Sequence, residues 1–72
     1  MERWRRIKDF PDHIISESGT VYDVRHLEFI KEKLTSEGER QVTLKNREHE
    51  ETLLVDQILF DSFDGGDIHA AR

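Results

Sequence analysis

The sequence predicts an α+β domain, with a small antiparallel sheet of three or four strands packed by one C-terminal helix. Over the first 54 residues, runs rich in β-branched and aromatic side chains alternate with turn signals. From residue 56 onward the spacing of the apolar positions becomes helical. A chain of 72 residues makes one domain with a small core. We expect that domain to span residues 1–64 and residues 65–72 to form a disordered tail.

The N-terminal third predicts a cap followed by a hairpin. In residues 4–10, apolar side chains recur at every third position, which fits a single helical turn or an irregular segment over the core. Residues 13–16 and 20–24 are β-rich runs around a short connector, which is typical of strand, tight turn and strand. Gly19 is the expected positive-φ residue of that turn.

The middle of the chain contains further candidate strands, of which a sheet of three or four strands would use one or two. Residues 27–34 alternate imperfectly, so the pattern does not fix the register of a strand there. A turn at 36–39 precedes a strand at 40–45, and a second turn at 45–48 precedes a strand at 49–55.

The last element is predicted to be a short amphipathic helix. Asp56 is expected as its N-cap or as an acid of its first turn, and the glycines after Asp64 end it. Ile58 flanks the apolar stripe, which is formed by Val55, Leu59, Ser62 and Phe63. The predicted core comprises Trp4, Ile7, Phe10, Ile15, Val21, Val42, Leu44, Leu53, Val55, Leu59 and Phe63.

Two blocks of the sequence resemble the small DNA-binding module that accompanies HNH homing endonucleases. Residues 4–21, WRRIKDFPDHIISESGTV, are similar to the family pattern W-x-x-I-x-G-F-x-x-Y-x-I/V-S-N-x-G-R-V. Residues 55–63, VDQILFDSF, are similar to V-H-R-L-V-A-x-A-F. The resemblance covers about residues 4 to 63. It implies the same fold, a position beside a metal-dependent nuclease, a role in holding DNA and a bacteriophage origin.

The chain departs from this family pattern where the module could touch phosphate. The family's His-Arg at the helix start is Asp56-Gln57, a small helix residue is Phe60, and the turn at 17–20 lacks the family's arginine. The HNH catalytic segment would follow the helix, but the sequence ends nine residues after Phe63. The four histidines show no metal-ligand spacing. We therefore expect a protein that is not an enzyme, with no catalytic residues, no metal and no cofactor.

The charge distribution favours a protein partner. Residues 1–8 have a balance of +3, whereas residues 9–72 have a balance of −8. Residues 48–67 hold seven acids and no Lys or Arg, and such a surface repels phosphate. On a helical wheel Phe60 lies at the edge of the core or exposed, so it could anchor an interface with an acidic rim. A merely solvated acidic face, and a Phe60 folded under the tail or packed against Trp4, remain open.

The leading hypothesis is a non-catalytic, phage-type protein that binds and modulates a host protein with a basic surface involved in nucleic-acid processing. It would inhibit that protein as a mimic of DNA. Its predicted contact residues are Asp56, Gln57, Phe60, Asp61, Asp64, Glu50 and Glu51.

The alternative is a DNA-binding accessory module of an HNH-type nuclease that binds duplex DNA. Trp4 among arginines is a pattern that can stack on nucleic acid. The predicted DNA-binding residues are Arg3, Arg5, Arg6, Arg25, Lys31 and Lys33. The absence of cysteine, of a signal peptide and of an apolar run of about 18 residues predicts a soluble, intracellular protein, away from membranes. The family resemblance implies that this compartment is the cytoplasm of a bacterial host. A homodimer is left open.

Overall fold

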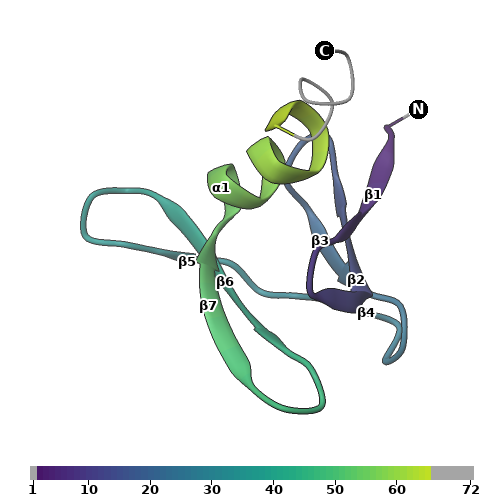
Figure 1. The fold of residues 1–72 in the computed structure, drawn as a ribbon. Helices are drawn as coiled ribbons and strands as arrows, with labels where there is room; N and C mark the ends of the chain where they lie inside the picture. Colours follow the sequence, from purple (N-terminus) through teal and green to yellow (C-terminus); the bar gives the residue numbers. More distant parts are fainter. Residues whose placement is uncertain (1, 66–72) are drawn as a thin grey trace.

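The computed structural model describes residues 2–65, with the side chains of residues 2–63. This part of the chain is α+β, as predicted (Figure 1). Its elements are β1 (Trp4–Ile7), β2 (Phe10–Ser16), β3 (Val21–Asp23), β4 (Glu28–Phe29), β5 (Lys33–Leu34), β6 (Arg40–Lys45), β7 (Glu50–Leu54), α1 (Val55–Leu59) and η1 (Phe60–Gly65), a π-helical segment. Beyond Gly65, the predicted disordered tail lies outside the described residues.

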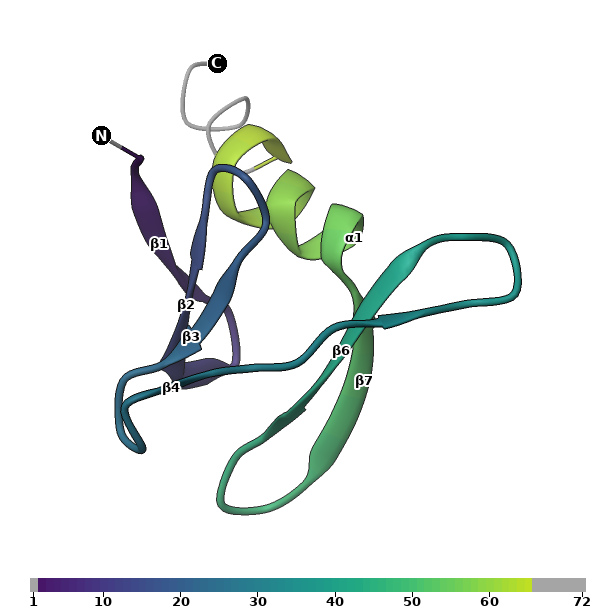
Figure 2. The ribbon, with the colours of Figure 1, turned by 180° about the vertical axis from the view of Figure 1, so that it is seen from behind.

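The strands form two antiparallel sheets instead of one. The first has the order β1-β2-β3-β4 and the second β5-β6-β7. The single strand expected at 27–34 is divided, with β4 in the first sheet and β5 in the second. Between them Ile30 packs against the core and donates its N–H to the carbonyl of Val21 at 2.9 Å. Figure 2 shows the chain crossing from one sheet to the other in this segment.

The N-terminal segment is a strand, so the predicted cap, a helical turn or an irregular segment over the core, is wrong. Arg5 pairs with Ile15 on the core side of the sheet, and neighbouring residues of a strand point to opposite faces. Trp4 therefore points away from the core and is 41% exposed, which corrects its assignment as a core residue. A register shift after Arg6 and the left-handed Asp9 (φ 69°) form the connection to β2.

The core lies between the two sheets and the helix. Eight of the eleven predicted core residues are buried: Ile7, Phe10, Ile15, Val21, Val42, Leu44, Val55 and Phe63. Leu53 and Leu59 only pack against this cluster, while Ile58 is 4% exposed and belongs to it. His13 is also buried, since it shares the inner face of β2 with Ile15.

The helix has the predicted acid in its first turn, but its second half is π-helical. Leu54 occupies the N-cap position without a side-chain cap, and Asp56 lies in the first turn. Because π-helical hydrogen bonds join residues five apart, η1 brings Phe63 to the buried side that Ile58 occupies. Regular α-helical spacing assigned that role to Leu59. In residues 2–65, no helix combines the length and the apolar composition needed to cross a membrane.

Gly19 lies in the turn between β2 and β3, where this turn contacts the rest of the domain. Its φ of +94° confirms the positive-φ prediction. A Cβ at this position would lie 2.7 Å from Nη2 of Arg40 and 2.9 Å from Cγ1 of Val55. The turn between β2 and β3 therefore packs closely against both the second sheet and the start of the helix.

Candidate nucleic-acid interface

The β6–β7 hairpin forms a two-stranded ribbon that projects away from the first sheet (Figures 1 and 2). Val42 and Leu44 of β6 point into the core, so the alternate residues of that strand face outward. Thr43 pairs with Thr52 across the ribbon, and their hydroxyl oxygens lie 2.9 Å apart. The ribbon thus has one apolar side and one polar side.

A hollow of about 430 Å³ opens on the polar side of this ribbon. Besides Ile30, the residues lining it are Lys31, Lys33, Gln41, Thr43, Glu50 and Thr52, which we call the ribbon face. Lys33 reaches it because β5 pairs with β6 and places Lys33 opposite Gln41. Two of the six predicted DNA-binding residues, Lys31 and Lys33, are therefore neighbours of hydroxyl and amide groups.

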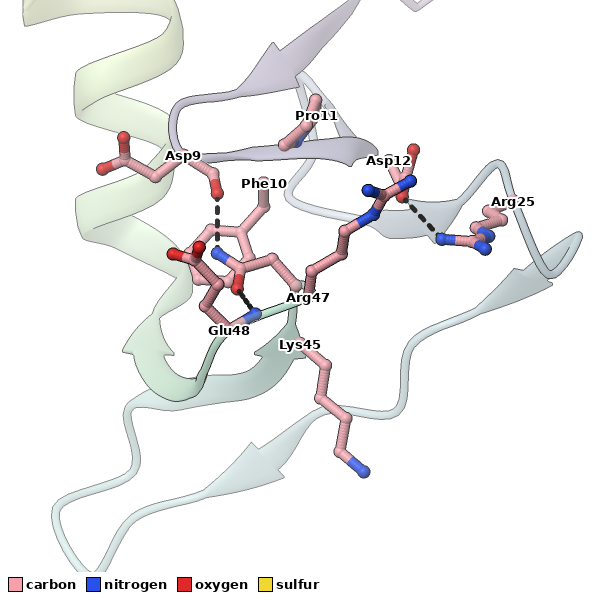
Figure 3. A pocket seen from close by; sticks show the side chains of 9 residues that line it. Asp9, Phe10, Pro11, Asp12, Arg25, Lys45, Arg47 and Glu48 are labelled. Carbon is pink, nitrogen blue, oxygen red and sulfur yellow. Dashed lines mark hydrogen bonds and ion pairs between the residues drawn. The ribbon is translucent and has the colours of Figure 1, made fainter.

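A second hollow, of about 600 Å³, lies at the turn of the ribbon (Figure 3). Arg25, Lys45 and Arg47 contribute positive charge, and the residues that contribute negative charge are Asp9, Asp12 and Glu48. Nη1 of Arg25 is 3.8 Å from Oδ2 of Asp12, and Figure 3 shows Arg47 extending toward the same carboxylate while Lys45 points away. Arg25 is thus placed near the ribbon turn, but the carboxylates offset its charge.

The remaining predicted bases lie elsewhere. Arg3 and Arg5 lie over the ring of Phe63, with guanidinium carbons 5.6 and 5.5 Å from its centroid. Arg3 also pairs with Glu17 at 3.1 Å, and hydrogen bonds from the backbone and side chain of Arg3 lower the pKa of Glu17. Arg6 points to the opposite face of the sheet from Arg5. The six bases do not form one continuous groove.

The predicted acidic contact residues are also divided. Because neighbours in a strand face opposite ways, Glu50 lies on the ribbon face while Glu51 lines a groove on the other side, together with Gln57 and Asp61. Gln57 donates a hydrogen bond to Asp61 at 3.2 Å. Phe60 is 51% exposed, and Asp56 is exposed on the same helix. Asp64 lies outside the residues whose side chains are described.

Sequence reasoning missed a buried polar network under the turn between β3 and β4. Asp23 accepts hydrogen bonds of 2.9 Å from the backbone N–H groups of Arg25 and His26. Nδ1 of His26 lies 2.9 Å from Oδ2 of Asp23, and Nε2 of His13 lies 3.6 Å from the same oxygen. Burial raises the pKa of Asp23, but these hydrogen bonds outweigh it and hold that pKa below 3.8.

This network has a structural role in the turn. It fixes the backbone of residues 23–26 just before Leu27, which has φ of 57°. Nothing in the spacing of two histidines and one aspartate signalled it. Among the described residues, no group of three or more His, Asp or Glu side chains is placed to hold a metal ion.

Among known proteins, the fold is similar to that of the HNH homing endonuclease I-HmuI, which binds and cleaves DNA. The TM-score is 0.79 at 21% sequence identity, and the match covers 85% of this chain and 36% of that protein. This chain therefore spans about a third of the endonuclease. No protein-family model and no curated protein matches the sequence. The resemblance suggested by residues 4–63 is confirmed as a shared fold.

Proposed function

We propose that this protein is a duplex-DNA-binding module that places its ribbon face in the major groove. The shared fold supports this function, because I-HmuI binds DNA. The major groove is about 12 Å wide and admits a two-stranded β-ribbon. The observation that carries the proposal is the grouping of lysines with side chains that can hydrogen-bond to bases on the outer side of such a ribbon.

The residues of the ribbon face divide into two roles. Lys31 and Lys33 neutralise phosphates and set the position of the ribbon on the duplex. Gln41 can make a paired hydrogen bond to adenine, and Thr43 and Thr52 can contact base edges or the thymine methyl group. Glu50 repels phosphate but can accept a hydrogen bond from the amino group of cytosine.

The charge of the protein sets the character of this binding. The net charge is −5, so the attraction for DNA comes from a local group of lysines and not from the whole molecule. We therefore expect weak binding that falls steeply as salt is added. The fold likeness favours this function over a host-protein partner. Inhibition of a host protein and mimicry of DNA stay predictions, and no catalytic step is proposed.

Fluorescence anisotropy of a labelled duplex, measured over a range of salt concentrations, tests the proposal. Each phosphate contact contributes about 0.9 to the slope of log K against log salt. A variant carrying Lys31→Ala and Lys33→Ala should bind more weakly, with a slope smaller by about 2. Lys8→Ala is the matched control, since Lys8 is exposed and lines the groove beside Asp61.

The double variant and the Lys8→Ala control together decide the question. Lys8→Ala should change affinity much less than the double variant, although it removes the same kind of charge. If all variants bind duplex with the same affinity and salt slope, or if the native protein does not bind at low salt, the proposal is wrong. Phe60→Ala should leave duplex binding unchanged, because Phe60 belongs to α1–η1 and does not line the ribbon face.

A further inference from the structure

The outer face of the first sheet carries an unusual set of side chains. In the register of β1 to β4, Arg6 pairs with Ile14, Ile14 with Tyr22, and Tyr22 with Phe29. Residues paired in this way lie on the same face of an antiparallel sheet. Trp4 is two residues before Arg6 in β1 and shares that face. We call these five residues the sheet face.

The sheet face is aromatic and open to solvent. Trp4 is 41% exposed and Phe29 is 65% exposed, while Tyr22 is partly exposed. The rings of Tyr22 and Phe29 meet edge to face, with centroids 4.8 Å apart. Trp4 lies two strands and two residues from Tyr22, which corresponds to about 12 Å between their backbones. The face therefore offers two separate aromatic surfaces.

The charge of the sheet face is positive. None of its five positions holds an acid, and Asp12, two residues before Ile14 on the same side of β2, pairs with Arg25. Arg6 takes part in no ion pair within the described residues. An exposed arginine beside aromatic rings can neutralise a phosphate or stack on a base. A partner with an aliphatic surface would need neither an arginine nor flat aromatic rings on this face.

We infer that the sheet face binds single-stranded nucleic acid by stacking unpaired bases on Trp4 and on the Tyr22–Phe29 pair, with Arg6 on the phosphate backbone. Single strands expose the flat surfaces of their bases, whereas a duplex buries them in its own stack. This site belongs to the other sheet from the ribbon face and does not depend on the proposed duplex binding.

A second copy of the chain fits the sheet face less well. Two copies meeting face to face about a twofold axis would each bring Arg6 into the contact, and the acid on the same side of β2, Asp12, already pairs with Arg25. A charge buried without a partner is costly. A nucleic-acid strand supplies the missing negative charge.

Fluorescence of Trp4 tests the inference directly, because it is the one tryptophan of the chain. Titration with an oligothymidylate should quench it, and an abasic oligomer of the same length, which has the phosphates but no bases, should not. Phe29→Ala should weaken oligothymidylate binding roughly tenfold. Leu34→Ala is the control, because Leu34 is 70% exposed but lies on β5 of the other sheet. The affinity of this variant for oligothymidylate should equal that of the native protein.

Three results would overturn the inference. They are no quenching by oligothymidylate, equal quenching by the abasic oligomer, and an unchanged affinity in Phe29→Ala. Sedimentation over a range of protein concentrations adds a fourth, because a dimer that Phe29→Ala abolishes would assign the face to a second copy. The Lys31→Ala and Lys33→Ala variant should retain the quenching. Loss of duplex binding and loss of strand binding can therefore be told apart.

Discussion

Replacement of Gly19 by alanine should destabilise the domain much more than replacement of Gly38. Both glycines have positive φ, +94° and +84°. Alanine at either position therefore costs about 1 kcal/mol of backbone strain. Their surroundings differ, because a Cβ at Gly19 would lie 2.9 Å from Cγ1 of Val55, whereas a Cβ at Gly38 would meet no atom within 4 Å.

The extra cost at Gly19 comes from Val55. The guanidinium of Arg40, 2.7 Å from the added Cβ, can swing away at the expense of its 3.4 Å hydrogen bond to the carbonyl of Ser18. Val55 is fully buried at the first residue of α1, so relieving its contact means shifting the helix start. Crowding of this kind costs about 1–3 kcal/mol. The expected loss is about 2–4 kcal/mol for Gly19→Ala and about 1 kcal/mol for Gly38→Ala.

Urea denaturation measures both losses on one scale. A domain of 72 residues has a free energy of unfolding of about 4–11 kcal/mol, so Gly19→Ala should remove a large share of it. The midpoint should fall in both variants, further for Gly19→Ala, without a change in the m-value. Equal losses for the two variants would refute the close approach of the hairpin turn to the helix.

Three further variants test other parts of the fold. Ile58→Ala should lower the free energy of unfolding by about 2–5 kcal/mol and Leu59→Ala by less, because Ile58 is 4% exposed and Leu59 is only partly buried; equal losses in urea would contradict the placement of Ile58 in the core. Because the pKa of Asp23 is lowered from 3.8 on folding, its carboxylate stabilises the fold above about pH 4, and this contribution is lost as the pH falls through the lowered pKa. Thermal unfolding across that range should show a steeper loss on acidification for the native protein than for Asp23→Asn, and parallel curves would count against the network. Trp4→Ala should lower the free energy of unfolding by less than the roughly 3–5 kcal/mol expected for a buried tryptophan, since Trp4 is 41% exposed. A loss of that full size in a urea titration would mean that Trp4 is a core residue.

The features predicted well from sequence depend on neighbours along the chain. The hairpin around Gly19 follows from a glycine between two β-rich runs, and φ of +94° agrees with it. Val42 and Leu44, two apart, share the buried side of β6. The helix begins at Val55, one residue before the predicted change of spacing. Each of these signals is contained within about ten residues.

The features predicted poorly depend on pairing between distant segments or on irregular backbone. Residues 27–34 could not be divided between two sheets by their own alternation, because each half pairs with a different strand. The face on which Trp4 lies is set by its pairing with β2. The exchange of Leu59 for Ile58 in the core follows from the π-helical segment, which no spacing rule anticipates.

The candidate site was predicted only in part, for a similar reason. Lys31 and Lys33 were named from their charge, and the structure places them on one hollow. Thr43 and Thr52 come together only through the register of β6 and β7. A threonine on an exposed strand carries no signal in the sequence that distinguishes a contact with DNA from ordinary solvation.

The packing of Arg3 and Arg5 on Phe63 brings the two ends of the described chain together. The entropic free-energy cost of closing a loop of about 60 residues exceeds that of closing a loop of about six residues by about 2 kcal/mol. We therefore expect the contact of Arg3 and Arg5 with Phe63 to form after the hairpins during folding. It should also open before them when the native protein fluctuates. In hydrogen exchange, the amides of β1 and η1 should lose protection first. The arginines released in that opening would be free to meet other anions.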